Sequence, residues 1–89
     1  MEHAQFEMLV HQYSDTIYRV AYQALKNRAD AEDVVQTVLL KLFERSASFE
    51  SPQHIRNWLL HVTVNECRKV LRTPWRKRIF PLEEGRDEP

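Results

Sequence analysis

The chain has 89 residues, 43% of them hydrophobic, and a formal net charge of zero. This length accommodates one domain with a small core and excludes a second. One glycine disfavours sheets with tight hairpins, a single cysteine excludes an internal disulfide, and no apolar run is long enough to cross a membrane. Because the N-terminus also lacks a signal-peptide pattern, we expect a soluble, cytoplasmic protein with no membrane partner.

Charge is distributed unevenly along the chain. Residues 56–78 carry seven bases and one acid, whereas residues 1–55 carry eight acids and five bases, and residues 79–89 four acids and one base. A local basic block of this kind would attract a polyanion such as nucleic acid. The alternative is a solvated helix end, whose bases complement the helix dipole.

Apolar residues at three- and four-residue spacing predict a first helix over about residues 4–26. Its predicted core face consists of Phe6, Leu9, Val10, Tyr13, Ile17, Val20, Ala21 and Ala24. A short connection follows, and Asp30 is the predicted N-cap of a second helix over about residues 30–46.

A third helix is predicted over about residues 52–72, because Ser51-Pro52 provides a cap followed by proline at the first helical position. Thr73-Pro74 should end it, since the residue before proline avoids helical angles. Residues 74–89 hold two further prolines and many charges, and are predicted to be an irregular linker with a basic start. The expected fold is all-α, a small bundle of three helices within residues 1–73.

The second helix has an unusual outer face. At 100° per residue, one arc is apolar and must be core: Ala31, Val34, Val35, Val38, Leu39 and Leu42. Outside it lie Asp33, Gln36, Thr37, Leu40, Phe43 and Glu44. An apolar spot rimmed by polar groups is typical of a protein–protein site. The alternative is a broad core, with Leu40 covered by the tail or by the first helix.

The third helix also has a face that its own core does not need. Opposite its apolar arc, and without an acid, lie His54, Asn57, Trp58, His61, Asn65, Arg68, Lys69 and Arg72. Cations hold phosphates, a ring stacks on a base and amides read base edges, so this composition suits nucleic acid. The alternative places Trp58 in the core and leaves the other side chains as a solvated surface.

The sequence contains no recognisable catalytic or metal-binding motif. His54 and His61 are two helical turns apart, roughly 10 Å along the axis, which is too far to share one zinc ion. Cys67 lies on the apolar arc, where a thiol is usually inert. We therefore expect no enzyme activity, no metal and no cofactor.

Three stretches of the sequence, taken together, resemble a known family. They are DAEDVVQTVLLKLF (30–43), SFESPQ (48–53) and WLLHVTVNECRKVLR (58–72). In order, spacing and loop length they resemble region 2 of bacterial RNA polymerase sigma factors of the extracytoplasmic-function (ECF) group, within the sigma-70 family. The resemblance spans about residues 4–80. It implies a transcription-initiation factor domain that binds core RNA polymerase and recognises and melts the promoter −10 element.

The resemblance implies that the outer face of the second helix docks on the coiled coil of the clamp in the largest polymerase subunit. Asp33 and Gln36 match the motif residues that make those contacts. Thr37 departs from the family, in which a glutamate usually follows that glutamine. Leu40 and Phe43 would be apolar neighbours in the same interface, which would explain why they lie outside the core.

The resemblance also implies that the loop before the third helix captures a base flipped out of the −10 element, while the helix lies along the non-template strand. The loop positions are Phe49, Glu50, Ser51, Pro52 and Gln53. Asn65 matches an asparagine that lines the base pocket, and Arg68, Lys69 and Arg72 would hold the DNA backbone. The composition of the same helix face adds four further candidate DNA contacts, His54, Asn57, Trp58 and His61.

Members of the ECF group also carry a C-terminal helix-turn-helix domain that reads the −35 element, and this sequence does not contain it. Residues 74–89 resemble the start of the linker to such a domain, so we expect the chain to be an excised or truncated part. Whether an anti-sigma factor covers these faces stays open. The alternative function is a helical adaptor that binds only protein.

Overall fold

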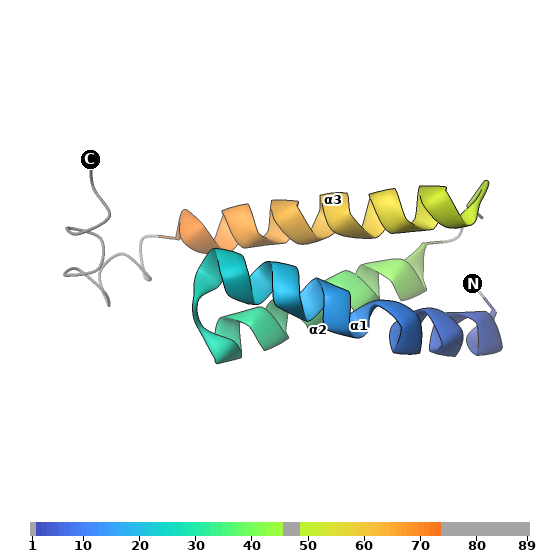
Figure 1. The fold of residues 1–89 in the computed structure, drawn as a ribbon, viewed down its shortest axis with the longest axis horizontal. Helices are drawn as coiled ribbons and strands as arrows, with labels where there is room; N and C mark the ends of the chain where they lie inside the picture. Colours follow the sequence, from blue (N-terminus) through green and yellow to red (C-terminus); the bar gives the residue numbers. More distant parts are fainter. Residues whose placement is uncertain (1, 46–48, 74–89) are drawn as a thin grey trace.

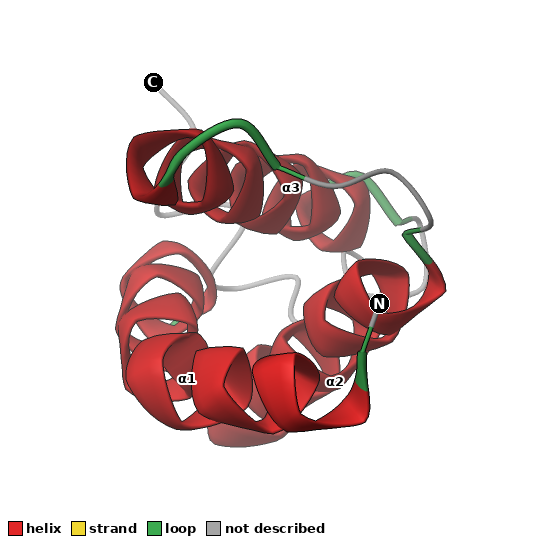
Figure 2. Ribbon diagram, turned by 90° about the vertical axis from the view of Figure 1, so that its right-hand side faces the viewer, coloured by secondary structure: helices red, strands yellow, loops and turns green. Residues whose placement is uncertain are grey.

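The protein forms a bundle of three helices. The computed structural model describes residues 2–45 and 49–73, in which α1 spans His3–Leu25, α2 spans Arg28–Glu44 and α3 spans Pro52–Leu71 (Figure 1). Consecutive helices run antiparallel, and each helix packs against the other two (Figure 2). The described ranges contain no strand, so the predicted all-α fold is confirmed.

The connection between α1 and α2 is shorter than the sequence predicts. Lys26 ends α1 in the left-handed region, at φ 53° and ψ 34°, and its backbone N–H donates to the Tyr22 carbonyl at 2.7 Å. Asn27 is extended, and its side-chain oxygen accepts from the Asp30 N–H at 2.8 Å. The prediction that Asp30 is the N-cap is therefore wrong: Asn27 caps α2, which begins at Arg28, and Asp30 lies in its first turn.

The ends of α1 and α3 agree with the predicted ranges 4–26 and 52–72 to within one residue. The Ser51 hydroxyl accepts from the His54 N–H at 3.1 Å, which confirms the predicted cap of α3. The predicted end of α2 near residue 46 is two residues too late, because the helix ends at Glu44 and Arg45 is extended. The predicted linker 74–89 lies outside the described residues.

The core is built from one apolar face of each helix. Its buried residues are Leu9, Tyr13, Ile17, Ala21 and Leu25 of α1, Ala31, Val34, Val38 and Leu42 of α2, and Leu59, Thr63 and Cys67 of α3. Leu25 takes the place at the end of α1 that the sequence analysis gave to Ala24, which is exposed. The buried Thr63 hydroxyl donates to the Leu59 carbonyl at 2.7 Å, so its burial leaves no unpaired donor.

None of the helices in the described part of the chain combines the length and the apolar character that crossing a membrane would require.

Candidate functional site

The outer face of α2 is exposed where the sequence predicts it to be. Leu40 is 56% exposed and Phe43 49%, and Asp33 and Gln36 are also exposed. Thr37 is half-buried, so less of its side chain is available to a partner. The described residues therefore leave Leu40 uncovered, so α1 does not cover it, and the alternative of cover by the tail lies outside the described residues.

Phe43 differs from Leu40 because α1 supports it. Its ring meets that of Phe6 edge-on, with centroids 5.1 Å apart and an interplanar angle of 71°. This contact holds the Phe43 ring in place while about half of the side chain stays exposed. The apolar spot on α2 therefore has one supported member and one member that projects from the surface.

A concavity lies between α1 and α2, next to this outer face. It has a volume of about 320 Å³ and is lined by Ser14, Asp15, Tyr18, Glu32, Val35 and Gln36. Gln36 was predicted from the sequence as a site residue, whereas Asp15 and Tyr18 of α1 were not. No pattern within one helix could have found them, because they reach the site only through the packing of α1 on α2.

The N-terminal end of α3 carries an aromatic cluster. The Phe49 ring meets the His54 ring at 5.1 Å and the Trp58 ring at 5.7 Å between centroids, both edge-on. The Arg45 guanidinium lies 4.2 Å from the Phe49 centroid and 5.3 Å from that of Trp58. Phe49, His54 and Trp58 are half-buried, and Trp58 also packs against the core. The three rings were predicted from the sequence as site residues, whereas Arg45 was not.

Hydrogen bonds fix several of the predicted DNA contacts near this cluster. The Glu50 N–H donates to His54 Nδ1 at 3.1 Å, so that ring nitrogen acts as an acceptor. Gln53 Nε2 donates to Asn57 Oδ1 at 3.0 Å on the exposed surface. Ser51 is engaged as the helix cap, which makes its hydroxyl a positioning group for the loop. His61, one turn further, is exposed.

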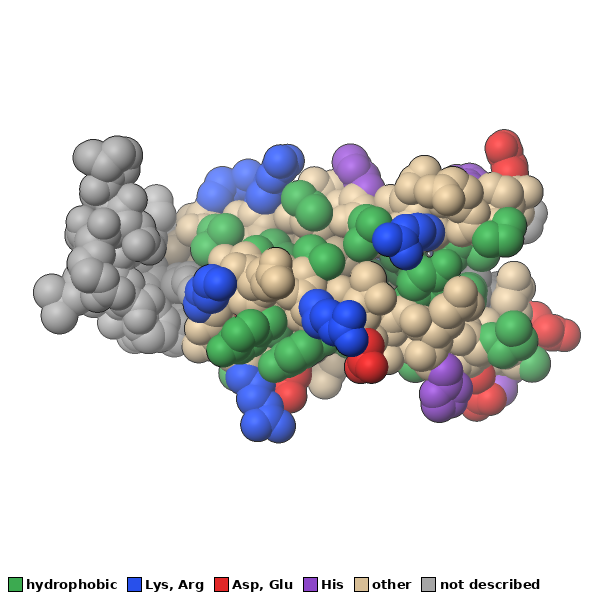
Figure 3. Space-filling view, viewed as in Figure 1, with side chains coloured by type: hydrophobic (Ala, Val, Ile, Leu, Met, Phe, Trp, Pro, Cys, Tyr) green, Lys and Arg blue, Asp and Glu red, His purple; other side chains and the backbone are tan. Residues whose placement is uncertain are grey.

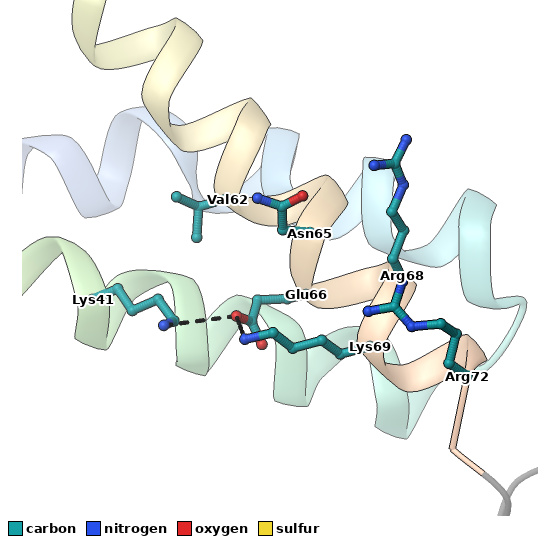
Figure 4. Close-up of a pocket in the computed structure, with 7 residues that line it drawn as sticks. All are labelled: Lys41, Val62, Asn65, Glu66, Arg68, Lys69 and Arg72. Carbon is teal, nitrogen blue, oxygen red and sulfur yellow. Dashed lines mark hydrogen bonds and ion pairs between the residues drawn. The ribbon is translucent and has the colours of Figure 1, made fainter.

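The C-terminal half of α3 forms a basic pocket together with α2. It has a volume of about 290 Å³ and is lined by Lys41, Val62, Asn65, Glu66, Arg68, Lys69 and Arg72 (Figure 4). Glu66 Oε2 lies 3.1 Å from Lys69 Nζ and 3.8 Å from Lys41 Nζ, and its side chain is only 13% exposed. The sequence predicted four of these residues (Asn65, Arg68, Lys69 and Arg72) and missed Lys41.

The aromatic cluster and the basic pocket lie on the same face of α3 but at different positions along the helix. Trp58 and Asn65 are seven residues apart, which is roughly 10 Å along the axis. Figure 3 shows Lys and Arg side chains gathered over the C-terminal half of α3. One nucleic-acid strand that lay along this face would therefore be long enough to contact both the aromatic cluster and the basic pocket.

The described residues contain no group of three or more His, Cys, Asp or Glu side chains placed to hold a metal ion. Burial, and next the nearby Glu66 carboxylate, raise the pKa of the Cys67 thiol. A thiol with a raised pKa is mostly protonated at neutral pH and is a poor nucleophile.

Comparison with known proteins bears on this arrangement. Residues 9–77 match the family sigma-70 region 2. The chain is similar to the ECF RNA polymerase sigma factor SigE of Mycolicibacterium smegmatis, with 34% identity over 82 residues that cover 92% of this chain and 32% of the relative. It is also similar to the ECF RNA polymerase sigma factor SigW of Bacillus subtilis, with 30% identity over 60 residues that cover 67% of this chain and 32% of the relative.

The chain thus spans about a third of the length of these curated relatives. No solved structure gives a significant match. The chain belongs to the sigma-70 region 2 family, which confirms the resemblance found in the sequence.

Proposed function

We propose that this member of the sigma-70 region 2 family is the part of a transcription-initiation factor that binds core RNA polymerase with one face and the promoter −10 element with another. The observation that carries the proposal is the presence of two different exposed faces on two helices. The outer face of α2 combines apolar and polar groups, and α3 bears bases, amides and rings. The names of the relatives, both ECF RNA polymerase sigma factors, support the same function.

The polymerase surface is centred on Leu40. Asp33, Gln36 and Phe43 surround it, and Thr37 takes a smaller part because it is half-buried. Covering an exposed leucine removes apolar surface from water, while the carboxylate and the amide select a partner with complementary charge and hydrogen bonding. The partner surface proposed is the coiled coil of the clamp in the largest polymerase subunit.

The DNA face runs along α3, and its partner is the non-template strand of the −10 element. Phe49 and its neighbours at the start of α3 accept a flipped base, whose lost stacking must be replaced by protein contacts. Asn65 reads a base edge with its amide. The bases Arg68, Lys69 and Arg72 hold phosphates and position the strand without reading sequence.

The competing function is a helical adaptor that binds protein alone. The exposure of Leu40 and Phe43 fits that function as well, and the bases of α3 would then be merely solvated. An anti-sigma factor that covers either face is a further candidate partner. A factor that initiates transcription acts in the cytoplasm, so the proposed function implies that location.

The two functions differ in their response to DNA and salt. The chain, bound to bacterial core polymerase, is titrated against a labelled single strand with a randomised −10 segment and against the matching duplex, with fluorescence anisotropy as the readout. We expect tighter binding to the single strand and a steep loss of affinity as salt rises. Polymerase binding without capture of any strand would favour the adaptor, and failure to bind polymerase would contradict the proposed role of the outer face of α2.

A further inference from the structure

Lys41 belongs to the basic pocket and not to the outer face of α2. It directly follows Leu40, and successive helical residues point about 100° apart, so the two side chains leave α2 in different directions. Lys41 Nζ lies 3.8 Å from the Glu66 carboxylate of α3, which places it on the flank that faces α3. Figure 4 shows its ammonium group pointing at Glu66 together with that of Lys69.

The charge in this pocket is strongly unbalanced. Four bases line it (Lys41, Arg68, Lys69 and Arg72), against one acid, Glu66. Glu66 contacts both lysines, whereas Arg68 and Arg72 have no acid partner among residues 2–45 and 49–73. Figure 4 shows the Lys41 and Lys69 ammonium groups meeting at Glu66, with the Arg68 side chain turned away from them and Arg72 at the end of α3. This excess of positive charge over one acid attracts an anion, and both arginine and lysine bind phosphate oxygens.

We propose that Lys41 is a DNA-contacting residue, and that the pocket between α2 and α3 holds one backbone phosphate of the non-template strand. The proposal rests on the proposed function of α3. The phosphate is approached from two elements, by Lys41 from α2 and by Lys69 from α3, and the arginines add positive charge along α3. A phosphate held from two sides fixes the register of the strand relative to the aromatic cluster, roughly 10 Å away along the helix.

Glu66 has a second consequence for the pocket. Its carboxylate holds Lys41 and Lys69 in place, but it also opposes an incoming phosphate. Because like charges repel at short range, Glu66 should lower the affinity of the pocket for any strand. The acid therefore limits phosphate binding that carries no sequence information.

The test uses the chain bound to core polymerase and a labelled −10 single strand selected by the wild-type complex. Lys41→Gln should weaken strand binding roughly 3- to 10-fold on all sequences and lower the salt slope by about 0.7, the value for one phosphate contact on single-stranded DNA. Arg19→Gln is the matched control, because it removes the same charge from an exposed position on α1 and should change neither quantity.

A neutral methylphosphonate, moved along the strand one linkage at a time, then locates the phosphate. In the wild type, substitution at one linkage should reduce strand affinity the most. In Lys41→Gln the reduction at that linkage should be smaller, since the two changes remove the same contact. Additive losses at every linkage would overturn the proposal. A loss of polymerase affinity without DNA, and no loss of strand binding, would assign Lys41 to the polymerase surface and overturn it as well.

Glu66→Gln tests the same pocket, with an expected change in strand affinity opposite to that of Lys41→Gln. Thermal unfolding first establishes that the Glu66→Gln variant is folded. The folded variant should bind the strand more tightly than the wild type, because the one acid in the pocket is removed. Weaker binding by a folded Glu66→Gln variant would overturn the proposal. If the wild-type complex binds no strand at all, the proposed function itself fails, which is a result distinct from both.

Discussion

Leu40 and Phe43 stand next to each other on the outer face of α2, yet they are held differently. The Phe43 ring packs edge-on against the Phe6 ring, so a substitution of Phe43 would disturb the packing of α1 as well as any partner contact. Leu40 is the more exposed of the two, at 56%. Leu40 is therefore the cleaner probe of a partner surface.

We expect Leu40→Asp to leave the melting temperature nearly unchanged and to weaken binding to core polymerase by about 1–3 kcal/mol, as for a contact residue near an interface centre. Calorimetry of the free chain and a binding titration with core polymerase measure the two quantities. Met8→Asp on α1 is the control, because Met8 is also exposed but lies outside this face. Unfolding of Leu40→Asp would show that Leu40 is core.

Trp58 holds an intermediate position between core and surface. It packs against the core on one side and meets Phe49 on the other, which suggests a role in holding the loop rather than in stacking on DNA directly. Trp58→Ala should therefore lower the free energy of unfolding by about 3 kcal/mol, measured by urea denaturation. Phe49→Ala should lower it less. Native stability of Trp58→Ala, combined with lost strand binding, would instead make Trp58 a stacking platform.

At the scale of the helices, periodicity carried most of the prediction. The apolar face of α2 was predicted correctly, because each of its residues repeats at helical spacing and is buried or half-buried in the structure. The start of α2 was missed because Asn27 and Asp30 are both good caps, and only the left-handed turn at Lys26 decides between them. Such turns usually involve glycine, so a lysine gives no signal.

Candidate site residues on single helix faces were likewise open to prediction, whereas those that depend on helix pairing were not. Lys41 reaches the basic pocket, and Arg45 the aromatic cluster, only because α2 packs beside α3. The pattern within α2 alone indicates only that Lys41 is a solvated base between Leu40 and Leu42. A single sequence gives no spacing rule that connects it to Glu66.

The cap of α2 gives a prediction at this scale. Asn27→Ala should lower the free energy of unfolding by about 1 kcal/mol, because the Asp30 N–H loses its acceptor at the helix start. Asp30→Asn, which removes only a charge from the first turn, should cost a few tenths of a kcal/mol. Chemical denaturation of both variants compares them directly. A larger loss for Asp30→Asn would restore Asp30 as the more important residue.

The whole molecule has one small core shared by three helices, so a single buried group should affect global unfolding. Cys67 is such a group, and burial raises the pKa of its thiol in the folded state. The unfolded chain then loses the thiol proton at lower pH than the folded one. This contribution to stability is complete below the unfolded pKa and is lost as the pH rises through the raised folded value.

We therefore expect the free energy of unfolding to fall as the pH rises above about 9, the ordinary value for the thiol. Cys67→Ala should show less of this fall, although its starting stability is lower because of the cavity it leaves. Denaturation curves across alkaline pH measure the difference between the two proteins. Parallel pH profiles would show that other groups cause the decline.

The two-residue connection at Lys26 and Asn27 also bears on the order in which the molecule forms. A short link between antiparallel helices makes their contacts local in sequence, and local contacts form fastest. During synthesis, α1 and α2 leave the ribosome before α3 does, and they can pair as a hairpin while α3 is still being made. The surface around Leu40 would then form ahead of the proposed DNA face, whose basic pocket requires α3 to pack beside Lys41.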